Sequence, residues 1–377
     1  MEYDDTYTPA MDIILPTISR SKPSKMAVIY PLYDDIHSGL GHAQNLINSG
    51  MITKTVLQGK SLIFPIKSKY IPYSIYETIK EKLIEQLEYT FVIGERTISI
   101  RIGKLSDAPI DLAKMLLTMF SWLYVCDKYS DKQCGKKQII NIYLSNFKKQ
   151  LPSNGEILGP YNVNSAYSTV CKVENDICIF REEEWFKVFI HETFHSYGFD
   201  LPKLANDQIA SELAVMCSLQ STILVSESYV ETWSRIINAI YNSILNSDSK
   251  KECMRILDFS LQVEGQFSVI QSSRVLAHMN ITYVDLINKS ISTEFRENSN
   301  VFAYYILSAA MMHNPYTFIL WCKKHNTDHI FKLNNHSINS FITLMRDTMH
   351  DTSLISYYKS IQPITNMGAR FSIIDAV

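Results

Sequence analysis

The sequence predicts an α+β fold in which a small mixed sheet and one long apolar helix precede a mostly helical C-terminal half. Before residue 200, short apolar or alternating segments typical of strands occur between segments with helical spacing. After residue 198, apolar residues recur almost throughout at the spacing of a helix. The chain has 377 residues and is 46% hydrophobic, which is enough for about two domains with buried cores.

We therefore expect three parts along the chain. They are a flexible N-terminal arm at residues 1–24, an α/β domain at residues 25–200 and a helical domain at residues 201–377. The boundary is expected where Gly198, Asp200 and Pro202 interrupt the helical pattern.

The first half is expected to alternate strands with helices. Residues 97–102 read Thr-Ile-Ser-Ile-Arg-Ile, an alternation with a period of two that predicts a half-buried strand. The expected elements in this part are a strand at 26–30, a helix at 76–87, strands at 97–102 and 139–144, and a helix at 109–128.

A hairpin and a helix are expected next. Residues 164–173 and 177–180 form the two predicted strands of the hairpin, with its turn at residues 174–176. The helix is expected at residues 182–197, because three acids in its first turn favour the positive end of a helix and Gly198 favours its end. Further helices are expected at residues 205–224, 226–246, 250–263, 265–279, 299–313, 315–325 and 336–349.

Composition excludes several classes of function. Lys and Arg number 36 against 38 Asp and Glu, so there is no basic excess of the kind that a dedicated nucleic-acid-binding protein uses to neutralise phosphates. The N-terminal residues are acidic and carry no secretory signal pattern. The most apolar segment, residues 110–126, is short and contains Asp111 and Lys114, which favours a buried helix over a membrane span. We therefore expect a cytoplasmic protein.

The cysteines do not form a zinc-binding pattern. There are seven of them, they are scattered, and no two are spaced as CxxC. Cys171 and Cys178 could face each other across the predicted hairpin, although a disulfide is not expected in a reducing cytosol.

The predicted helix at 182–197 carries the chemistry. It contains His191-Glu192-Thr193-Phe194-His195, an HExxH pattern. Histidines four residues apart lie one turn apart on the same helical face, so their imidazoles can converge on one zinc ion. Glu192 projects beside them and can act as the general base toward a metal-bound water. Two histidines and a glutamate in so apolar a segment are costly to bury unless they are paired or ligated.

A third metal ligand is needed, and the sequence offers several candidates. The metzincin spacing requires a ligand at position 201, which is Leu. Glu227 and Glu231 lie one helical turn apart in a later predicted helix, and we assign Glu227 as the ligand and Glu231 as the acceptor for a histidine N–H. These two roles could be exchanged, both acids could simply line a solvated helix face, and Glu212 is a weaker candidate.

With this downstream ExxxE pair, residues 95–235 resemble gluzincin-type zinc metallopeptidases. Residues 159–166, together with residues 181–192, also resemble zincin-like proteins of large nucleocytoplasmic DNA viruses. The resemblance implies a zincin-like fold, Zn²⁺ as cofactor, a peptide or protein substrate, and an edge strand at residues 162–168 that binds the extended substrate. A viral origin would imply the host cytoplasm or the virion as the location. Ser226 stands where well-studied gluzincins have an asparagine, which leaves the subfamily and specificity open.

A peptidase also needs a donor for the developing oxyanion. We select Tyr305 from a group of candidates that also contains Tyr304, Tyr229, His278 and His313. The sequence thus predicts a zinc metallopeptidase. The alternatives are a zincin-like structural or interaction protein with little turnover, such as a virion or host-interaction component, and a protein in which HExxH occurs by chance and binds no zinc. The oligomeric state cannot be read from the sequence.

Overall fold

The computed structural model describes residues 5–19, 21, 23–105, 110–217, 219, 223–288, 295–326, 328–362, 364 and 366–377. The chain divides into two compact units. The α/β unit comprises Tyr30–Lys148, Asn164–Phe199 and Ala376–Val377, and the helical unit comprises Met1–Ile29, Lys149–Val163 and Asp200–Asp375. One change of unit falls at Phe199/Asp200, next to the predicted boundary. The others were not predicted, because short crossing segments change neither composition nor periodicity.

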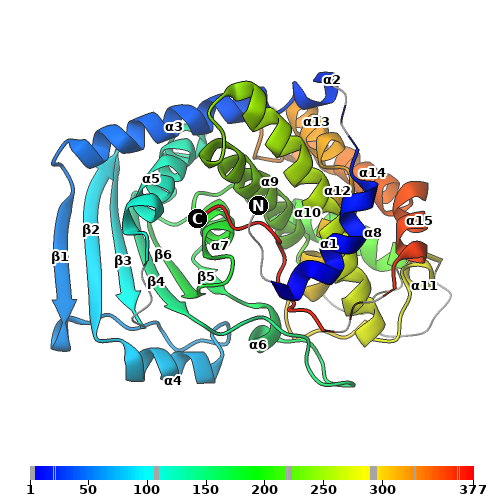
Figure 1. Ribbon diagram of the computed structural model, residues 1–377, viewed down its shortest axis with the longest axis horizontal. Helices are drawn as coiled ribbons and strands as arrows, with labels where there is room; N and C mark the ends of the chain where they lie inside the picture. The colour runs from blue at the N-terminus through cyan, green and yellow to red at the C-terminus, as the bar shows by residue number, and fades with distance from the viewer. Residues whose placement is uncertain are drawn as a thin grey trace. The chain divides into compact units, whose positions relative to one another are not determined.

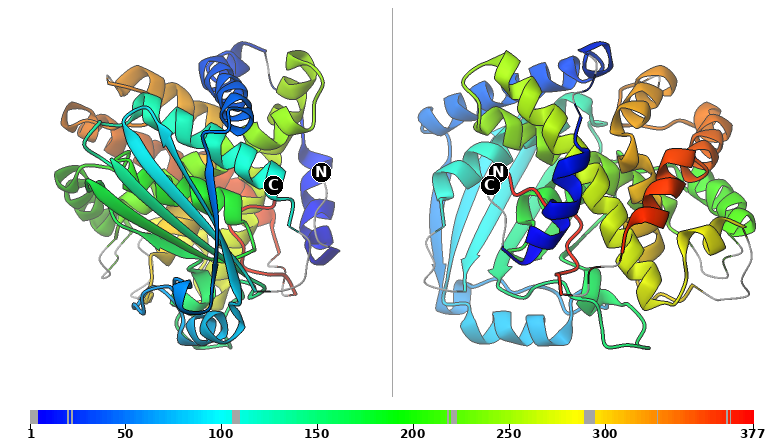
Figure 2. Two further views of the ribbon diagram at one scale, coloured as in Figure 1. Left: turned by 90° about the vertical axis from the view of Figure 1, so that its left-hand side faces the viewer. Right: turned by 45° about the vertical axis from the view of Figure 1, so that its right-hand side comes forward.

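A six-stranded mixed sheet forms the centre of the α/β unit (Figure 1). β1, β2 and β3 are antiparallel, β3, β4 and β6 are parallel, and β5 returns antiparallel at the edge. In sheet order the strands are β1 (Thr53–Gln58), β2 (Glu85–Ile93), β3 (Arg96–Lys104), β4 (Lys137–Ser145), β6 (Glu174–Arg181) and β5 (Ala166–Ser168). The strands fan out with the usual twist (Figure 2, left). The expected mixed sheet is therefore confirmed.

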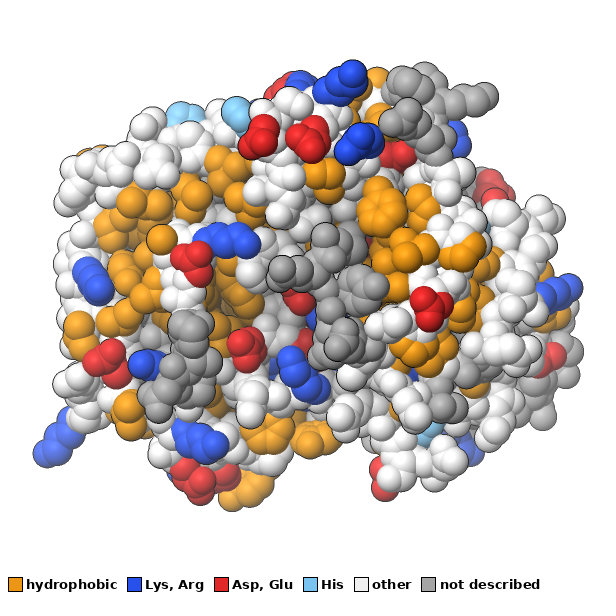
Figure 3. Space-filling view, viewed as in Figure 1, with side chains coloured by type: hydrophobic (Ala, Val, Ile, Leu, Met, Phe, Trp, Pro, Cys, Tyr) orange, Lys and Arg blue, Asp and Glu red, His pale blue; other side chains and the backbone are white. Residues whose placement is uncertain are grey.

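Helices cover both faces of this sheet. On one face, α5 (Leu112–Tyr129) packs Phe120 against Phe91 of β2, with ring centroids 4.3 Å apart, and α3 (Tyr30–Asn48) packs on α5. On the other face, α4 (Tyr73–Lys82) contributes to an apolar cluster that contains Tyr143. An apolar groove of about 480 Å³ remains between α3, α5, β1 and β2. Hydrophobic side chains gather over this part of the surface (Figure 3).

Several predicted elements of this unit are confirmed, and the hairpin turn is corrected. The expected strands at 97–102 and 139–144 are β3 and β4, and the expected helices at 109–128 and 182–197 are α5 and α7 (Trp185–Ser196). The turn is not at residues 174–176, which belong to β6. Asn175 explains the difference, because its side-chain oxygen accepts hydrogen bonds from the preceding loop at Thr169 and Lys172.

Two other predictions for the first half were wrong, and one strand was not predicted. Residues 26–30 form no strand, because α2 (Pro23–Met26) and α3 flank them, and the helix predicted at 76–87 ends at Lys82, before β2. β1 was not predicted, since its side chains are mostly exposed and its polar residues give no apolar alternation.

The helical unit is built around one long helix, α10 (Lys250–His278), which contacts α1, α9, α12 and α15. Residues 8–14, predicted as part of a flexible arm, form α1 and bury Ala10 and Ile14. The other helical segments of this unit are η1 (Asp5–Tyr7), α1 (Thr8–Ile14), η2 (Leu15–Thr17), α2 (Pro23–Met26), α6 (Pro160–Val163), α8 (Lys203–Cys217), α9 (Val225–Leu245), α11 (Tyr283–Asn288), η4 (Phe302–Leu307), α12 (Ser308–His313), α13 (Pro315–His325), η5 (Asn335–Ser337), α14 (Ile338–Met349) and α15 (Thr352–Ser360).

The two helices predicted at 250–263 and 265–279 are one continuous helix, α10, and Gly265 lies within it. A Cβ atom at this position would lie 2.3 Å from the carbonyl oxygen of Met312 in α12. The glycine therefore permits two helices to pack closely and does not end α10. Among the described residues, no helix is both long and apolar enough to cross a membrane.

Candidate metal centre

Helix α7 places two imidazoles side by side. His191 and His195 are four residues apart on one face, and only 6% and 8% of their surfaces are exposed. Their Nε2 atoms lie 3.2 Å apart. Two nitrogens bound to one tetrahedral zinc at about 2.0–2.1 Å would lie about 3.3 Å apart. The pair therefore already has the separation that a shared zinc ion requires.

The C-terminal part of α7 is anchored by other elements of the α/β unit. Trp122 of α5 donates a 2.6 Å hydrogen bond from Nε1 to the hydroxyl of Thr193, between the two histidines. The backbone N–H of Cys171 donates to the carbonyl oxygen of His195, and Asn175 donates to that of Ser196. The last two bonds go to carbonyls at the C-terminal end of α7, where the helix itself supplies no further N–H donors. The histidines therefore stand on a rigid turn.

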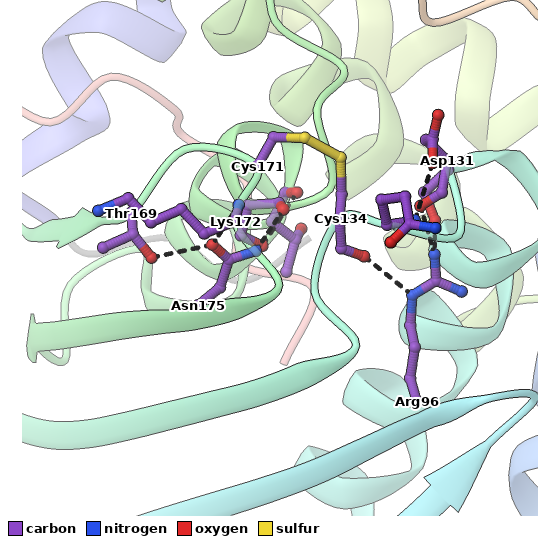
Figure 4. The surroundings of a disulfide bond; sticks show 11 residues. Arg96, Asp131, Cys134, Thr169, Cys171, Lys172 and Asn175 are labelled. Carbon is purple, nitrogen blue, oxygen red and sulfur yellow. Dashed lines mark hydrogen bonds between the residues drawn. A yellow bond between two sulfur atoms is a disulfide. The ribbon is translucent and has the colours of Figure 1, made fainter.

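A disulfide joins this anchoring loop to the loop before β4. It links Cys134 with Cys171, and the Cys134 carbonyl accepts a hydrogen bond from Arg96 (Figure 4). Cys178, which the sequence offered as a partner for Cys171, is instead a buried residue of β6 that forms no disulfide. It points to the opposite side of the sheet, into the apolar cluster with Tyr143. Burial raises the pKa of the Cys178 thiol, which keeps it protonated.

Glu192 is oriented by the edge strand of the sheet. Its Oε2 accepts a 2.6 Å hydrogen bond from the hydroxyl of Ser168, the last residue of β5. The carboxylate is largely buried beside the two histidines. A carboxylate held this way has a defined direction, which a group that transfers protons needs.

Glu227 lies in the first turn of α9, where the helix dipole favours a negative charge. The hydroxyl of Tyr304 donates a 3.1 Å hydrogen bond to its Oε2 atom. Ligand atoms of His191, His195 and Glu227 all lie within 4.8 Å of one another. The structure thus brings together the three residues that the sequence analysis selected as ligands, and this set could hold a metal ion.

The other two acids considered have different surroundings. Glu231 accepts a 2.9 Å hydrogen bond from Arg235, and both side chains are only 1% exposed. Its proposed bond to a histidine N–H stays a prediction. Glu212 lies on the surface, where it pairs with Arg346 at 3.9 Å.

The tyrosine beside the site is Tyr304, and this corrects the selection of Tyr305. Tyr305 is 1% exposed, and its hydroxyl donates to the carbonyl oxygen of Ala369 in the core of the helical unit. Both residues lie in η4, a π-helical turn. A π-turn changes which side chains share a face, so spacing along the sequence could not distinguish the two tyrosines.

No protein-family model, curated protein or solved structure gives a significant match to the chain. We therefore infer the function from the geometry of the site.

Proposed function

We propose that this protein is a zinc-dependent metallopeptidase. The observation that carries the proposal is the 3.2 Å separation of the two histidine Nε2 atoms, with a Glu227 oxygen within 4.8 Å of the chosen histidine donors. Two imidazoles and a carboxylate form a donor set of catalytic zinc sites, in which the fourth position is left to water. The three residues present therefore fit this metal.

Zinc bound there would lower the pKa of a coordinated water and polarise the carbonyl of the substrate. The chain's own residues would perform the proton transfers. Glu192, oriented by Ser168, would take the proton from the attacking water and deliver it to the leaving amine. Tyr304 would orient Glu227 as a metal ligand through its hydrogen bond to the carboxylate.

The edge strand β5 supports an extended peptide as the substrate. Backbone hydrogen bonds to β6 are made at Ser165 and Thr169, on either side of β5. In an antiparallel ladder the bonded positions alternate, so the N–H and C=O groups of Ala166 and Ser168 point away from β6. A peptide could add there as a further strand. Ser168 also contacts Glu192, so the added strand would run beside the general base.

Two measurements test the proposal. Purified protein should contain about one equivalent of zinc, and His191→Ala should lose it. Glu192→Gln should keep the zinc and the fold but lose hydrolysis of a peptide mixture, since only the proton acceptor changes. Glu212→Gln, a surface acid, is the matched control and should retain both. Less than about a tenth of an equivalent of zinc in the wild-type protein would contradict the metal site. Full zinc without hydrolysis would instead identify a zinc-binding structural or interaction protein.

A further inference from the structure

A basic and aromatic segment lies beside the edge strand. Residues 59–76 contain three lysines and neither Asp nor Glu. Within this segment, residues 63–70 expose a mixture of apolar and basic side chains, and we call them the basic–aromatic loop. Ile66 is 67% exposed and Tyr70 is 48% exposed. Lys67 and Lys69 are exposed between them. Surface of this composition is suited to a partner that is both apolar and negatively charged.

The loop is held against the sheet by hydrogen bonds. The Ile66 N–H donates to the Tyr167 hydroxyl at 3.1 Å, and that hydroxyl donates to the Ile66 carbonyl at 3.2 Å. Asn164 donates to the Tyr70 carbonyl, and Tyr143 donates to the Ile63 carbonyl. The loop is therefore a fixed feature of the surface, and it is attached directly to β5 through Tyr167.

The pleat of β5 places this loop on the side of the sheet away from the metal ligands. Ser168 points toward α7 and bonds Glu192, whereas the preceding residue, Tyr167, points to the opposite side and bonds the loop. A peptide added to β5 would alternate in the same way. Every second side chain would face α7, and the side chains between them would face the basic–aromatic loop.

We propose that the basic–aromatic loop determines substrate specificity and selects extended peptides that present acidic side chains next to apolar ones. This role in substrate selection rests on the proposed peptidase function. Lys67 and Lys69 supply positive charge, and each lies over an aromatic ring, of Tyr73 at 4.7 Å and of Tyr70 at 5.1 Å. Ile66 and Tyr70 supply apolar contact area.

An anionic membrane is a second kind of partner for the basic–aromatic loop, because lysines among exposed aromatic residues also bind anionic lipid surfaces. The attachment to β5 favours the peptide. The loop is bonded to the strand whose free edge continues to Glu192, so its side chains are placed to meet residues of an added strand. The membrane is therefore treated as an outcome of the test.

The test measures binding separately from catalysis. Zinc-loaded Glu192→Gln protein is titrated with three fluorescent peptides that differ only in carrying Glu, Gln or Lys at alternate positions. We expect the Glu peptide to bind about tenfold more tightly than the Gln peptide at low salt, with the difference shrinking as salt is added. The Glu192→Gln protein that also carries K67E and K69E should instead bind the Lys peptide most tightly. The matched control, K323E with K324E, makes the same charge change on exposed residues of α13 and should not alter the preference.

Equal affinity for the three peptides, or a preference that K67E/K69E does not change, would overturn the proposal. Binding to phosphatidylserine-containing vesicles that is lost in K67E/K69E, without a peptide preference, would assign the loop to membranes and also overturn it. Failure of the proposed function is a separate result. A wild-type protein that hydrolyses no peptide, while the Glu192→Gln protein still prefers the Glu peptide, would refute the peptidase and leave the specificity of the loop standing.

Discussion

The hydroxyl of Ser168 donates a 2.6 Å hydrogen bond to the carboxylate of Glu192, and this bond links the edge strand to the proposed general base. A hydrogen bond to a charged group contributes about 1.5–3 kcal/mol. Ser168→Ala should therefore lower kcat by roughly ten- to a hundredfold with little change in zinc content. Steady-state kinetics checks this. Ser211→Ala removes a hydroxyl that bonds only within α8 and should leave kcat unchanged. An unaltered kcat for Ser168→Ala would mean that Glu192 needs no orienting donor.

The buried ion pair of Glu231 and Arg235 predicts a large effect on stability. Both side chains are almost fully buried, and Arg235 also donates to the hydroxyl of Ser268. Arg235→Met leaves the Glu231 charge without this partner, which should cost about 3–5 kcal/mol of unfolding free energy. Arg346→Met breaks an exposed pair with Glu212 and should cost at most about 1 kcal/mol. Urea denaturation of the metal-free proteins compares them, and similar losses in the two variants would refute the prediction.

Glu264 predicts how stability depends on pH. Its Oε1 accepts hydrogen bonds from Ser372 and from the backbone of Ile373 and Ile374. Burial nevertheless raises the pKa of this carboxyl from 4.5 to about 7. Between these two values the folded protein keeps a proton that the unfolded chain has lost, so this contribution to stability falls as pH rises.

The contribution of Glu264 to the free energy of unfolding is complete below pH 4.5 and is lost by about pH 7. The loss is on the order of 3 kcal/mol. Glu264→Gln stays neutral and should therefore gain stability relative to the wild type across this window. Unfolding free energies measured at intervals between pH 4 and about 8 test the sign. Glu252→Gln, on the same helix and half-buried, is the control. A relative stability of the Glu264 variant that is flat or falls with pH would contradict the burial argument.

The disulfide between Cys134 and Cys171 should stabilise both the α/β unit and the metal site. Its sequence separation is 37 residues, for which the loss of chain entropy in the unfolded state predicts about 3–4 kcal/mol. The double substitution C134S/C171S should lower the melting temperature of the metal-free protein. It should also weaken zinc binding in a competition with a chelating dye, because the disulfide holds the loop whose Cys171 backbone N–H donates to the His195 carbonyl. Dithiothreitol should lower the melting temperature of the wild type but not of the double variant. Equal sensitivity to the reductant would show that the disulfide is not responsible.

The shared helix face of His191 and His195 could be predicted, because it depends only on local geometry. Four residues span about one helical turn, and the apolar residues around the pattern predict a buried helix whatever the rest of the chain does. The same reasoning found β3, β4 and α5, which bury strongly patterned faces. It missed β1, since an exposed and polar strand has no such pattern.

Features that depend on which segments meet could not be predicted. A pairing of Cys171 with Cys178 was compatible with the sequence, but the two side chains belong to opposite sides of the sheet. Residues 250–279 were predicted as two helices but form one, α10, in which Gly265 admits the backbone of α12. A glycine in this role looks the same in sequence as one that ends a helix. Tyr305 was selected in place of its neighbour Tyr304, because the spacing of residues does not reveal the π-turn that places Tyr304 on Glu227.

The amino-acid sequence by itself therefore determined the mixed α/β class, the helix that carries HExxH and the shared face of its two histidines, since helical and strand periodicity are properties of neighbouring residues. Only the tertiary structure decided which tyrosine holds Glu227, which cysteine bonds Cys171 and which residue orients Glu192. Those contacts join residues that are 24 or more positions apart in the chain. They arise from the packing of whole elements, and no local pattern encodes them.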